Sequence, residues 1–315
     1  MKTIFTADYS VITFATSKFS YVKFALNCAR SVLRFNEIKI YIVSDLKIDI
    51  PAALKKNVFV IGAFPEHLDQ GTGIKLYIDQ YLQTKYTLFI DADCLCYGSL
   101  QPAFDVFKDK YVSVAGNMVK AADWCGEEQA KTIYKTFGLT KLARFNGGIY
   151  YIAKSNRSAK IFEKVREIAL DYDRLGFQRI HDNWINEEIL ISIAMGLYKE
   201  PPVADNSILM TDLYTDHHTS KLNVLTGYRE INNPVAGSAR HRPWYPKGKL
   251  KPLIVHFGSA NLYKYPYISQ HFLLKLNAKK IHPRIASILT MLLIHVPYKS
   301  RYWVLEKFSR RVFAK

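Results

Sequence analysis

The first forty residues alternate between short apolar strands and an amphipathic helix, and this pattern constrains the fold more than any other feature. Ser10 to Thr16 is rich in β-branched and aromatic residues, apolar side chains recur at helical spacing between Lys18 and Phe35, and Ile38 to Val43 is again apolar. Two strands joined by a long helix usually pair in parallel, because a tight turn cannot connect parallel strands. The sequence therefore predicts an α/β fold on a mostly parallel sheet.

The same alternation continues along the chain. Of the 315 residues, 49% are hydrophobic, which is ample for a large core, and no Ser/Gly/Pro-rich linker divides the chain. We expect one main domain, residues 1–270, followed by a C-terminal appendage, residues 271–315. Further strands are expected at 58–61, 87–90, 112–115, 148–153 and 253–257, helices at 71–82, 158–172 and 183–197, and a long loop at 232–251.

The cysteines and the apolar runs favour a cytoplasmic protein. Only four cysteines are present, and Cys94 and Cys96 lie too close in sequence for an ordinary disulfide, without the second ligand pair of a zinc site. Asp8 interrupts the N-terminal apolar residues before a signal peptide can form. The longest apolar run, Ile285 to Val296, is shorter than the roughly 20 residues that span a bilayer.

Positive charge is concentrated near the C-terminus. The chain has 44 Lys and Arg residues against 27 Asp and Glu, a net charge of +17, and the segment from Lys275 to Lys315 alone carries +9. Its cations alternate with apolar residues such as Leu292, Tyr302 and Trp303, which is typical of helices that lie on anionic membrane surfaces. The alternative is a basic helix packed on the main domain. No nucleic-acid-binding module is recognisable, so nucleic acid is not an expected partner.

Two carboxylates, Asp91 and Asp93, follow the expected strand at 87–90 directly. The C-terminal edge of an open α/β sheet is where ligands bind. Two carboxylates at this position can face a divalent cation that also contacts phosphate oxygens, which suits a nucleotide diphosphate. The alternative is a pair of surface aspartates in a turn.

Three segments in order resemble the GT-A-fold nucleotide-sugar glycosyltransferases, most closely family 8 and its bacterial lipooligosaccharide enzymes. They are the region from Lys75 to Pro102 that contains Asp91-Ala92-Asp93, Phe145-Asn146-Gly147-Gly148-Ile149, and Val255-His256-Phe257-Gly258. The resemblance covers roughly residues 8–265. It implies a GT-A fold, a mostly parallel Rossmann-like sheet flanked by helices. It also implies metal-dependent, retaining transfer of a hexose from a UDP-sugar to a hydroxyl of a glycan or lipid-linked glycan, at the inner face of the cell membrane.

The resemblance also implies roles for individual residues. Mn²⁺ or Mg²⁺ would be held by Asp91, Asp93 and His256, and an imidazole beside carboxylates favours Mn²⁺ over an all-oxygen Ca²⁺ site. Taken alone, His256 would be a structural histidine at a strand end. The donor-binding residues would be Ala15 and Thr16 at the nucleotide base, Lys75 facing the donor, Asn146, Gly147 and Gly148 at the sugar, and Lys264 at the diphosphate.

Several of these assignments have alternatives. Lys75 would otherwise be an exposed helix lysine. Asn146 would otherwise mark a β-bulge, whereas in the sugar-binding interpretation the two glycines let the sugar approach the backbone. Lys264 lies eight residues beyond His256, whereas the family usually has a lysine about six residues beyond. The cations of the loop at 232–251 could supply this charge instead, as a lid over the diphosphate.

The acidic residues near the expected helix at 183–197 are the catalytic candidates: Asp182, Glu187 and Glu188. The segment matches the family's Asp-Gln-Asp-aliphatic-Leu pattern imperfectly, because Asn186 and Glu187 stand where the family has Asp and Gln. A carboxylate there could act as nucleophile or stabilise an oxocarbenium-like centre. An inverting transferase would instead use one of the three as general base. Two further alternatives remain, an acidic helix start that favours the helix dipole and a non-catalytic sugar- or lipid-binding protein.

Overall fold

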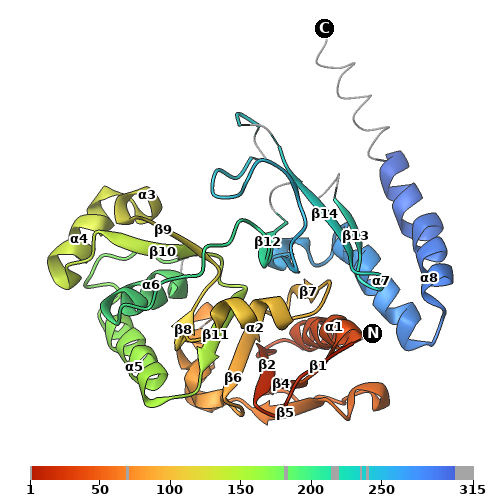
Figure 1. Ribbon diagram of the computed structural model, residues 1–315, viewed down its shortest axis with the longest axis horizontal. Helices are drawn as coiled ribbons and strands as arrows, with labels where there is room; N and C mark the ends of the chain where they lie inside the picture. The colour runs from red at the N-terminus through yellow and green to blue at the C-terminus, as the bar shows by residue number, and fades with distance from the viewer. Residues whose placement is uncertain are drawn as a thin grey trace, which may run out of the picture.

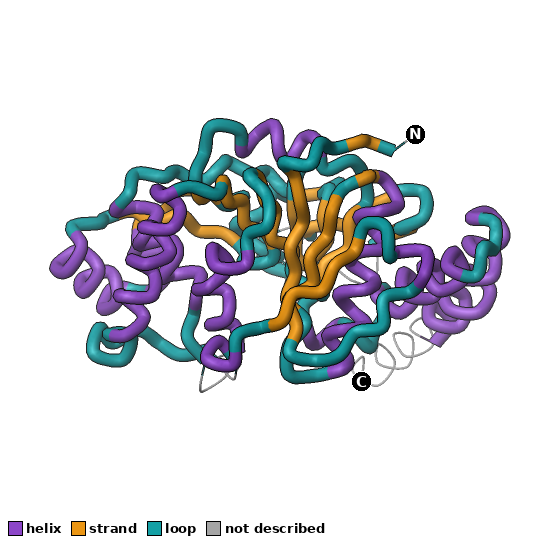
Figure 2. Tube along the Cα trace, turned by 90° about the horizontal axis from the view of Figure 1, so that it is seen from below, coloured by secondary structure: helices purple, strands orange, loops and turns teal. Residues whose placement is uncertain are grey.

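Four neighbouring strands of the central sheet run parallel, as the alternating sequence pattern predicts. The structure is a computed structural model and describes residues 2–68, 71–180, 184–213, 220–234, 236–238 and 241–301. The fifth strand, β11, is antiparallel to both of its neighbours, β6 and β8. Figure 2 shows the strands of the central sheet side by side. Their order is β5 (Val58–Gly62), β4 (Lys39–Ser44), β2 (Tyr9–Phe14), β6 (Tyr86–Ile90), β11 (Ile149–Ala153) and β8 (Val112–Ser113).

Helices cover both faces of this sheet, because successive strand side chains point to opposite sides and both sides are apolar. Val11 and Leu88 belong to the core on one face, Ile12 and Phe89 to the core on the other, and all four are fully buried. The first face is covered by α1 (Phe19–Phe35) and α2 (Gln101–Phe107), and the second by α5 (Asn156–Leu170), α6 (Glu187–Leu197) and the 3₁₀ helix η3 (Gly71–Tyr81).

A second, three-stranded sheet joins distant parts of the chain. Its middle strand β16 (Ile254–His256) is parallel to β12 (Met210–Asp212) and antiparallel to β7 (Cys94–Cys96), which begins shortly after β6 ends. In this register His256 lies directly opposite Cys94. The fold therefore brings the His-Phe segment beside the aspartates that follow β6.

Two excursions leave the central sheet (Figure 1). The first consists of β9 (Gly116–Lys120), α3 (Ala121–Cys125), α4 (Glu127–Phe137) and β10 (Lys141–Phe145). Strands β9 and β10 pair antiparallel, and Asn146 follows β10 directly. The second is an antiparallel meander: β13 (Lys221–Asn223), β14 (Tyr228–Asn233) and β15 (Gly248–Leu250). The shorter elements are β1 (Thr3–Ile4), which pairs with β3 (Asn36–Glu37), and the 3₁₀ turns η1 (Ala52–Leu54), η2 (Pro65–His67) and η4 (Ser259–Asn261).

The described part of the C-terminal appendage is helical. Helix α7 (Tyr267–Ala278) packs against α1 and buries Leu273 and Leu274, whereas α8 (Pro283–Thr290) and the π-helical turn Met291–His295 lie at the edge of the molecule (Figure 1). No helix among the described residues is long and apolar enough to cross a bilayer. Residues 302–315, with Tyr302 and Trp303, lie outside the described residues. Six apolar side chains on α8 and the helical turns that follow it are 48–62% exposed and are here called the C-terminal apolar patch: Ile285, Ile288, Met291, Leu292, Leu293 and Val296.

Several expected elements differ from the structure in type or in bounds. The segment 71–82 is a 3₁₀ helix rather than an α-helix, because glycines at 71 and 73 lower α-helical propensity and Arg166 binds the carbonyl of Leu76. Helix α6 begins only at Glu187, where the Asn186 side chain caps the backbone N–H of Glu188. The loop expected at 232–251 contains the paired ends of β14 and β15.

The helix expected at 158–172 is present as α5 but starts two residues earlier. Ser155 and Ser158 form a reciprocal capping box, in which each side chain bonds the other residue's backbone N–H. The Ser-x-x-Ser signal at this helix start was therefore readable in the sequence. The four cysteines are all unpaired.

Candidate active site

A cavity of about 550 Å³ lies at the carboxyl ends of β2 and β6. Thr16 follows β2, and Asp91 and Asp93 follow β6. His256 at the end of β16 and Glu187 at the start of α6 complete the lining near these carboxylates. Eight of the residues predicted from the sequence to bind donor or metal or to catalyse thus share one cavity, at the sheet edge where α/β proteins bind ligands: Thr16, Lys75, Asp91, Asp93, Gly147, Glu187, Glu188 and His256.

His256 is oriented by a hydrogen-bond network that begins at Asn146. Asn146 Oδ1 accepts hydrogen bonds from the Gly148 backbone N–H, at 3.0 Å, and from His256 Nδ1, at 2.6 Å. Because an amide oxygen only accepts, Nδ1 carries a hydrogen, and in the neutral imidazole the lone pair is on Nε2. Nε2 lies 3.1 Å from Asp93 Oδ1 and 4.0 Å from Asp91 Oδ2. A histidine whose second nitrogen is fixed in this way is typical of metal ligands.

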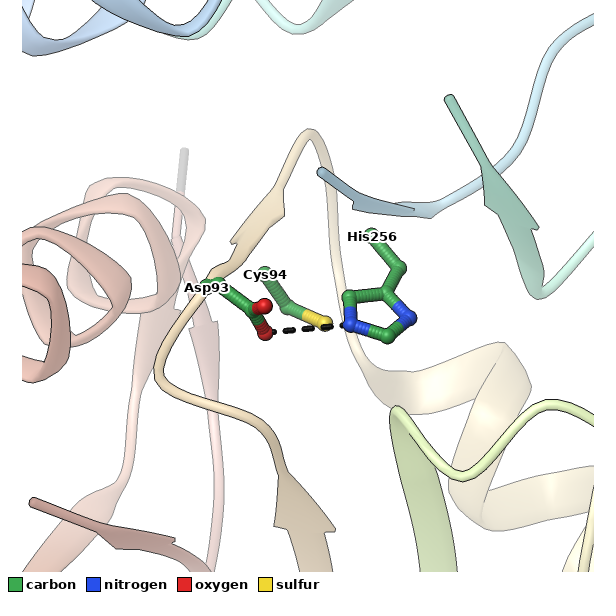
Figure 3. Close-up of side chains that lie close together, drawn as sticks. All are labelled: Asp93, Cys94 and His256. Atoms are coloured by element: carbon green, nitrogen blue, oxygen red, sulfur yellow. Dashed lines mark ion pairs between the residues drawn. The ribbon is translucent and has the colours of Figure 1, made fainter. Parts of the chain in front are cut away.

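The Cys94 thiol lies beside this pair (Figure 3). One ligand atom each from Asp93, Cys94 and His256 lie within 4.8 Å of one another. Carboxylate oxygens and an imidazole nitrogen are suitable donors for a divalent cation such as Mn²⁺ or Mg²⁺. The residues present therefore fit the metal that the sequence resemblance implies.

Lys75 joins the first aspartate to the acidic start of α6. Its ammonium donates to Asp91 Oδ2 at 2.7 Å and to the Gly147 carbonyl at 2.9 Å, and it lies 3.1 Å from Glu187 Oε1. The side chains of Lys75 and Glu187 are only 10% and 4% exposed. Lys75 is therefore a buried member of the cluster, which excludes the alternative of an exposed helix lysine.

The buried charges shift the pKa values of the cluster in different directions. Burial raises the pKa of Asp91 to about 6, because it outweighs the attraction of Lys75. Burial also opposes ionisation of Asp93, but the neighbouring His256 reverses the effect and lowers its pKa. For His256, burial would lower the pKa, whereas Asp93 and Asp91 raise it to about 9. The pKa of Glu188 is raised to about 7 by burial and by the charge of Glu187.

The two glycines after Asn146 make room for other side chains of the protein. A Cβ at Gly147 would lie 3.0 Å from the nearest carboxylate oxygens of Glu187 and Glu188, and a Cβ at Gly148 would lie 3.0 Å from His256 Nδ1. The expected reason for these glycines, approach of the sugar to the backbone, is therefore incomplete. Glycine is required at both positions because Glu187, Glu188 and His256 pack closely against the backbone there.

A second cavity of about 480 Å³ adjoins the first, and Glu188 lines both. Glu188 Oε1 accepts a 2.6 Å hydrogen bond from the Gly147 backbone N–H. The other walls come from both excursions of the chain, with Trp124 and Arg144 from the first and Trp244 and Tyr245 from the second. Sequence reasoning missed this cavity, because its walls are far apart in sequence.

The remaining predicted site residues are placed as follows. Ala15 is fully buried and lines neither cavity, and its carbonyl accepts a hydrogen bond from the Ser44 hydroxyl. Lys264 is exposed and lines neither cavity, so its role at the diphosphate stays a prediction. Asp182 lies outside the described residues. Asn146 contacts His256 directly, so its first role in this structure is to orient that side chain.

Sequence reasoning also missed several residues that line the first cavity. Tyr21 on α1 and Trp184 before α6 both contribute to its wall. His67 does so as well, stacked on Tyr77 and hydrogen-bonded to Tyr81 at 2.7 Å. An aromatic residue one turn into the helix after the first strand is a weak signal that could have indicated Tyr21. His67 carried no local signal.

The fold is also found among solved structures. No protein-family model matches the chain, and no curated relative does. The galactosyltransferase LgtC, solved in complex with donor and acceptor sugar analogs, matches with 17% identity and a TM-score of 0.53 over 86% of this chain and 96% of LgtC. An active-site mutant of LgtC matches with 16% identity and a TM-score of 0.54 over 85% and 95%. This chain has the GT-A fold. In GT-A terms, the first cavity lies where the sheet delivers Asp91-Ala92-Asp93, as predicted from the sequence.

Proposed function

We propose that this protein is a metal-dependent glycosyltransferase that moves a hexose from a UDP-sugar to a hydroxyl of a glycan acceptor. The observation that supports the proposal best is the convergence of Asp91, Asp93, His256 and Glu187 on one cavity at the carboxyl edge of a GT-A sheet. A site with an oriented imidazole, two aspartates and a buried carboxylate suits a diphosphate leaving group beside a reactive sugar carbon.

Asp91, Asp93 and His256 would together hold Mn²⁺ or Mg²⁺. When bound, this ion would neutralise the negative charge that develops on the leaving diphosphate. The residues of the chain itself do the rest. Thr16 and Tyr21 line the part of the cavity near the end of β2, where the nucleotide base would bind. Lys75 keeps two carboxylates in place and would supply positive charge beside the donor.

Glu187 is the candidate for the retaining reaction. It is buried, paired with Lys75 and packed against Gly147, so its position is fixed without a substrate. A fixed carboxylate below the anomeric carbon would form a glycosyl intermediate or stabilise positive charge on the ring. In this role the group acts mainly on the transition state.

One observation favours an inverting reaction as the second candidate. Glu188 lines both cavities, and its pKa is raised to about 7, which suits a general base near neutral pH. Glu188 would accept the proton of the acceptor hydroxyl, and the sugar carbon would be attacked from the opposite side to the leaving group. The anomeric configuration of the product, measured by proton NMR, distinguishes the two candidates.

The C-terminal segment supports a lipid-linked acceptor at an anionic membrane surface. The C-terminal apolar patch is followed in the same helix by Lys299 and Arg301 and preceded by Lys279, Lys280 and Arg284. Exposed aliphatic side chains beside cations are typical of helices at a membrane interface. We therefore propose a peripheral location at the inner face of the cell membrane. Helix α7 crosses the expected boundary at residue 270 and belongs to the core, so the membrane-binding part would begin after Ala278.

UDP release from a panel of UDP-hexoses, measured with and without Mn²⁺, tests the proposed function. Asp93→Asn and His256→Ala should abolish metal-dependent turnover while the circular dichroism spectrum is unchanged, and Glu128→Gln on the exposed surface of α4 is the matched control. Full turnover in EDTA would contradict the metal assignment, and no turnover of any UDP-hexose in the panel would contradict the proposed function. Glu187→Gln should lower kcat far more than it raises KM.

A further inference from the structure

The second cavity has the chemical character of a carbohydrate site. Trp124 on α3 and Trp244 on the loop before β15 both line it, and Trp244 remains 40% exposed. Asn117 and Arg144, directly opposite each other on β9 and β10, bring hydrogen-bond donors to the same cavity. Aromatic faces beside planar polar groups match a sugar ring, which has an apolar C–H face and a rim of hydroxyls.

Trp244 is held in place by contacts on several sides. The Arg144 guanidinium carbon lies 4.5 Å from the centre of its ring, close enough for a cation–π contact. Its neighbour Tyr245 donates a 2.8 Å hydrogen bond to Asp212 Oδ2. The fully buried Asn233 donates to the carbonyls of Tyr245 and Pro246. A preorganised aromatic surface costs little entropy when a ligand binds.

The charges of this cavity favour a neutral ligand. Among the described residues that line it, Arg144 is accompanied by the carboxylates of Glu188, Asp205 and Asp212, and the Arg242 guanidinium carbon lies 5.7 Å from the centre of the Trp244 ring. Asp205 accepts three backbone N–H bonds and is therefore occupied by the fold. Glu188 and Asp212 also accept hydrogen bonds from the protein, from the Gly147 backbone N–H and the Tyr245 hydroxyl. Among the described residues around this cavity, carboxylates thus outnumber guanidinium groups, which does not favour a phosphate or carboxylate.

We propose that the second cavity binds a neutral hexose unit of the acceptor glycan and that Trp244 is the stacking surface that selects it. This inference rests on the proposed function and adds the acceptor chemistry to it. Glu188 lines both cavities. A hydroxyl of this hexose would therefore lie close to the donor sugar beside Glu188. Trp244 is a specificity-determining residue and has no part in the cleavage of the donor.

Kinetic comparison of transfer and hydrolysis tests the inference. Transfer to lactose, maltose and methyl hexosides is measured beside UDP-sugar hydrolysis without acceptor. Trp244→Ala should lower kcat/KM for transfer about tenfold or more relative to hydrolysis, and Trp244→Phe, which keeps an aromatic face, should restore most of it. Tyr228→Ala, at an exposed aromatic of the same meander, is the matched control and should not change this ratio. Equal loss of both reactions in Trp244→Ala, or no loss, would overturn the inference.

Tryptophan fluorescence gives a readout that needs no turnover. Titration of these neutral sugars should change the emission of the full-length protein, and Trp244→Phe should remove most of that change. Binding of sialyllactose as tight as that of lactose would overturn the neutral assignment, and so would the absence of any response to the whole panel. If the wild-type protein consumed no UDP-sugar, the proposed function would fail, whereas the titration would still decide what the cavity binds.

Discussion

Replacement of Gly148 by alanine should damage both the stability and the metal site of this protein. The added Cβ would lie 2.9 Å from Met210 Sδ, 3.0 Å from His256 Nδ1 and 3.1 Å from Asn146 Oδ1. Ordinary contacts of a Cβ are about 3.4–4 Å, so each neighbour must move by several tenths of an ångström. The Met210 side chain can rotate, but Asn146 and His256 are bound to each other. Overpacking of this kind costs about 1–3 kcal/mol, and we expect about 2 kcal/mol.

Urea unfolding followed by circular dichroism measures the cost, with Gly62→Ala as the matched control. Gly62 ends the edge strand β5 and has nothing within 4 Å of its would-be Cβ, so its replacement should change the free energy of unfolding by less than about 0.5 kcal/mol. Gly148→Ala should lower the midpoint without changing the slope. It should also lower metal-dependent UDP release at least tenfold, because His256 moves relative to Asp93. A variant as stable and as active as the control would refute the packing argument.

Three further predictions concern the charged groups and the C-terminal helix. Lys75→Met should lower the free energy of unfolding by about 3–5 kcal/mol in EDTA, because it removes the ammonium group that two buried carboxylates share; a loss below about 1 kcal/mol in urea unfolding would contradict this. The folded-state pKa of Glu188 is raised from 4.5 to about 7, so its ionisation destabilises the fold as pH rises through this range. Glu188→Gln should therefore match wild type below pH 4.5 and become more stable than wild type by up to roughly 3 kcal/mol above pH 7; parallel stability–pH curves would exclude the shift. Three glutamates placed in the C-terminal apolar patch should reduce co-sedimentation with anionic vesicles, whereas Leu170→Glu, on the exposed surface of α5, should not; equal partitioning would leave a helix without a membrane role.

The sheet and the aspartates at its edge could be predicted because their signals are local. Strand β6 is mostly apolar and is followed directly by Asp91. A strand that is buried on both faces of a parallel sheet has apolar residues at successive positions, so it can be recognised in the sequence. His256 could be assigned only together with the aspartates, because its position depends on the pairing of β16 with β7, a long-range contact. A histidine at a strand end is otherwise uninformative.

The second cavity and the ion cluster could not be predicted, because they depend on how distant segments pack. Arg144 and Trp244 are separated in sequence by helices α5 and α6 and strands β11 to β14, and only the fold places the Arg144 guanidinium carbon 4.5 Å from the centre of the Trp244 ring. Lys75 was expected to face the donor, and its burial between Asp91 and Glu187 depends on how η3 packs beside the end of β6 and the start of α6. The start of α6 was misplaced because helical periodicity extends past a capping residue, here Asn186, and only the cap marks the boundary.

The Asn233 side chain has a consequence for how proteins of this kind can diversify. Its amide group donates to the carbonyls of Arg242, Tyr245 and Pro246, and its oxygen accepts from the Arg242 backbone N–H. The loop is thus anchored through main-chain atoms, which every residue type supplies. Side chains on the loop can then change by mutation without loss of its path. New acceptor preferences could evolve, or be engineered, by substitution on this loop while the catalytic sheet stays as it is.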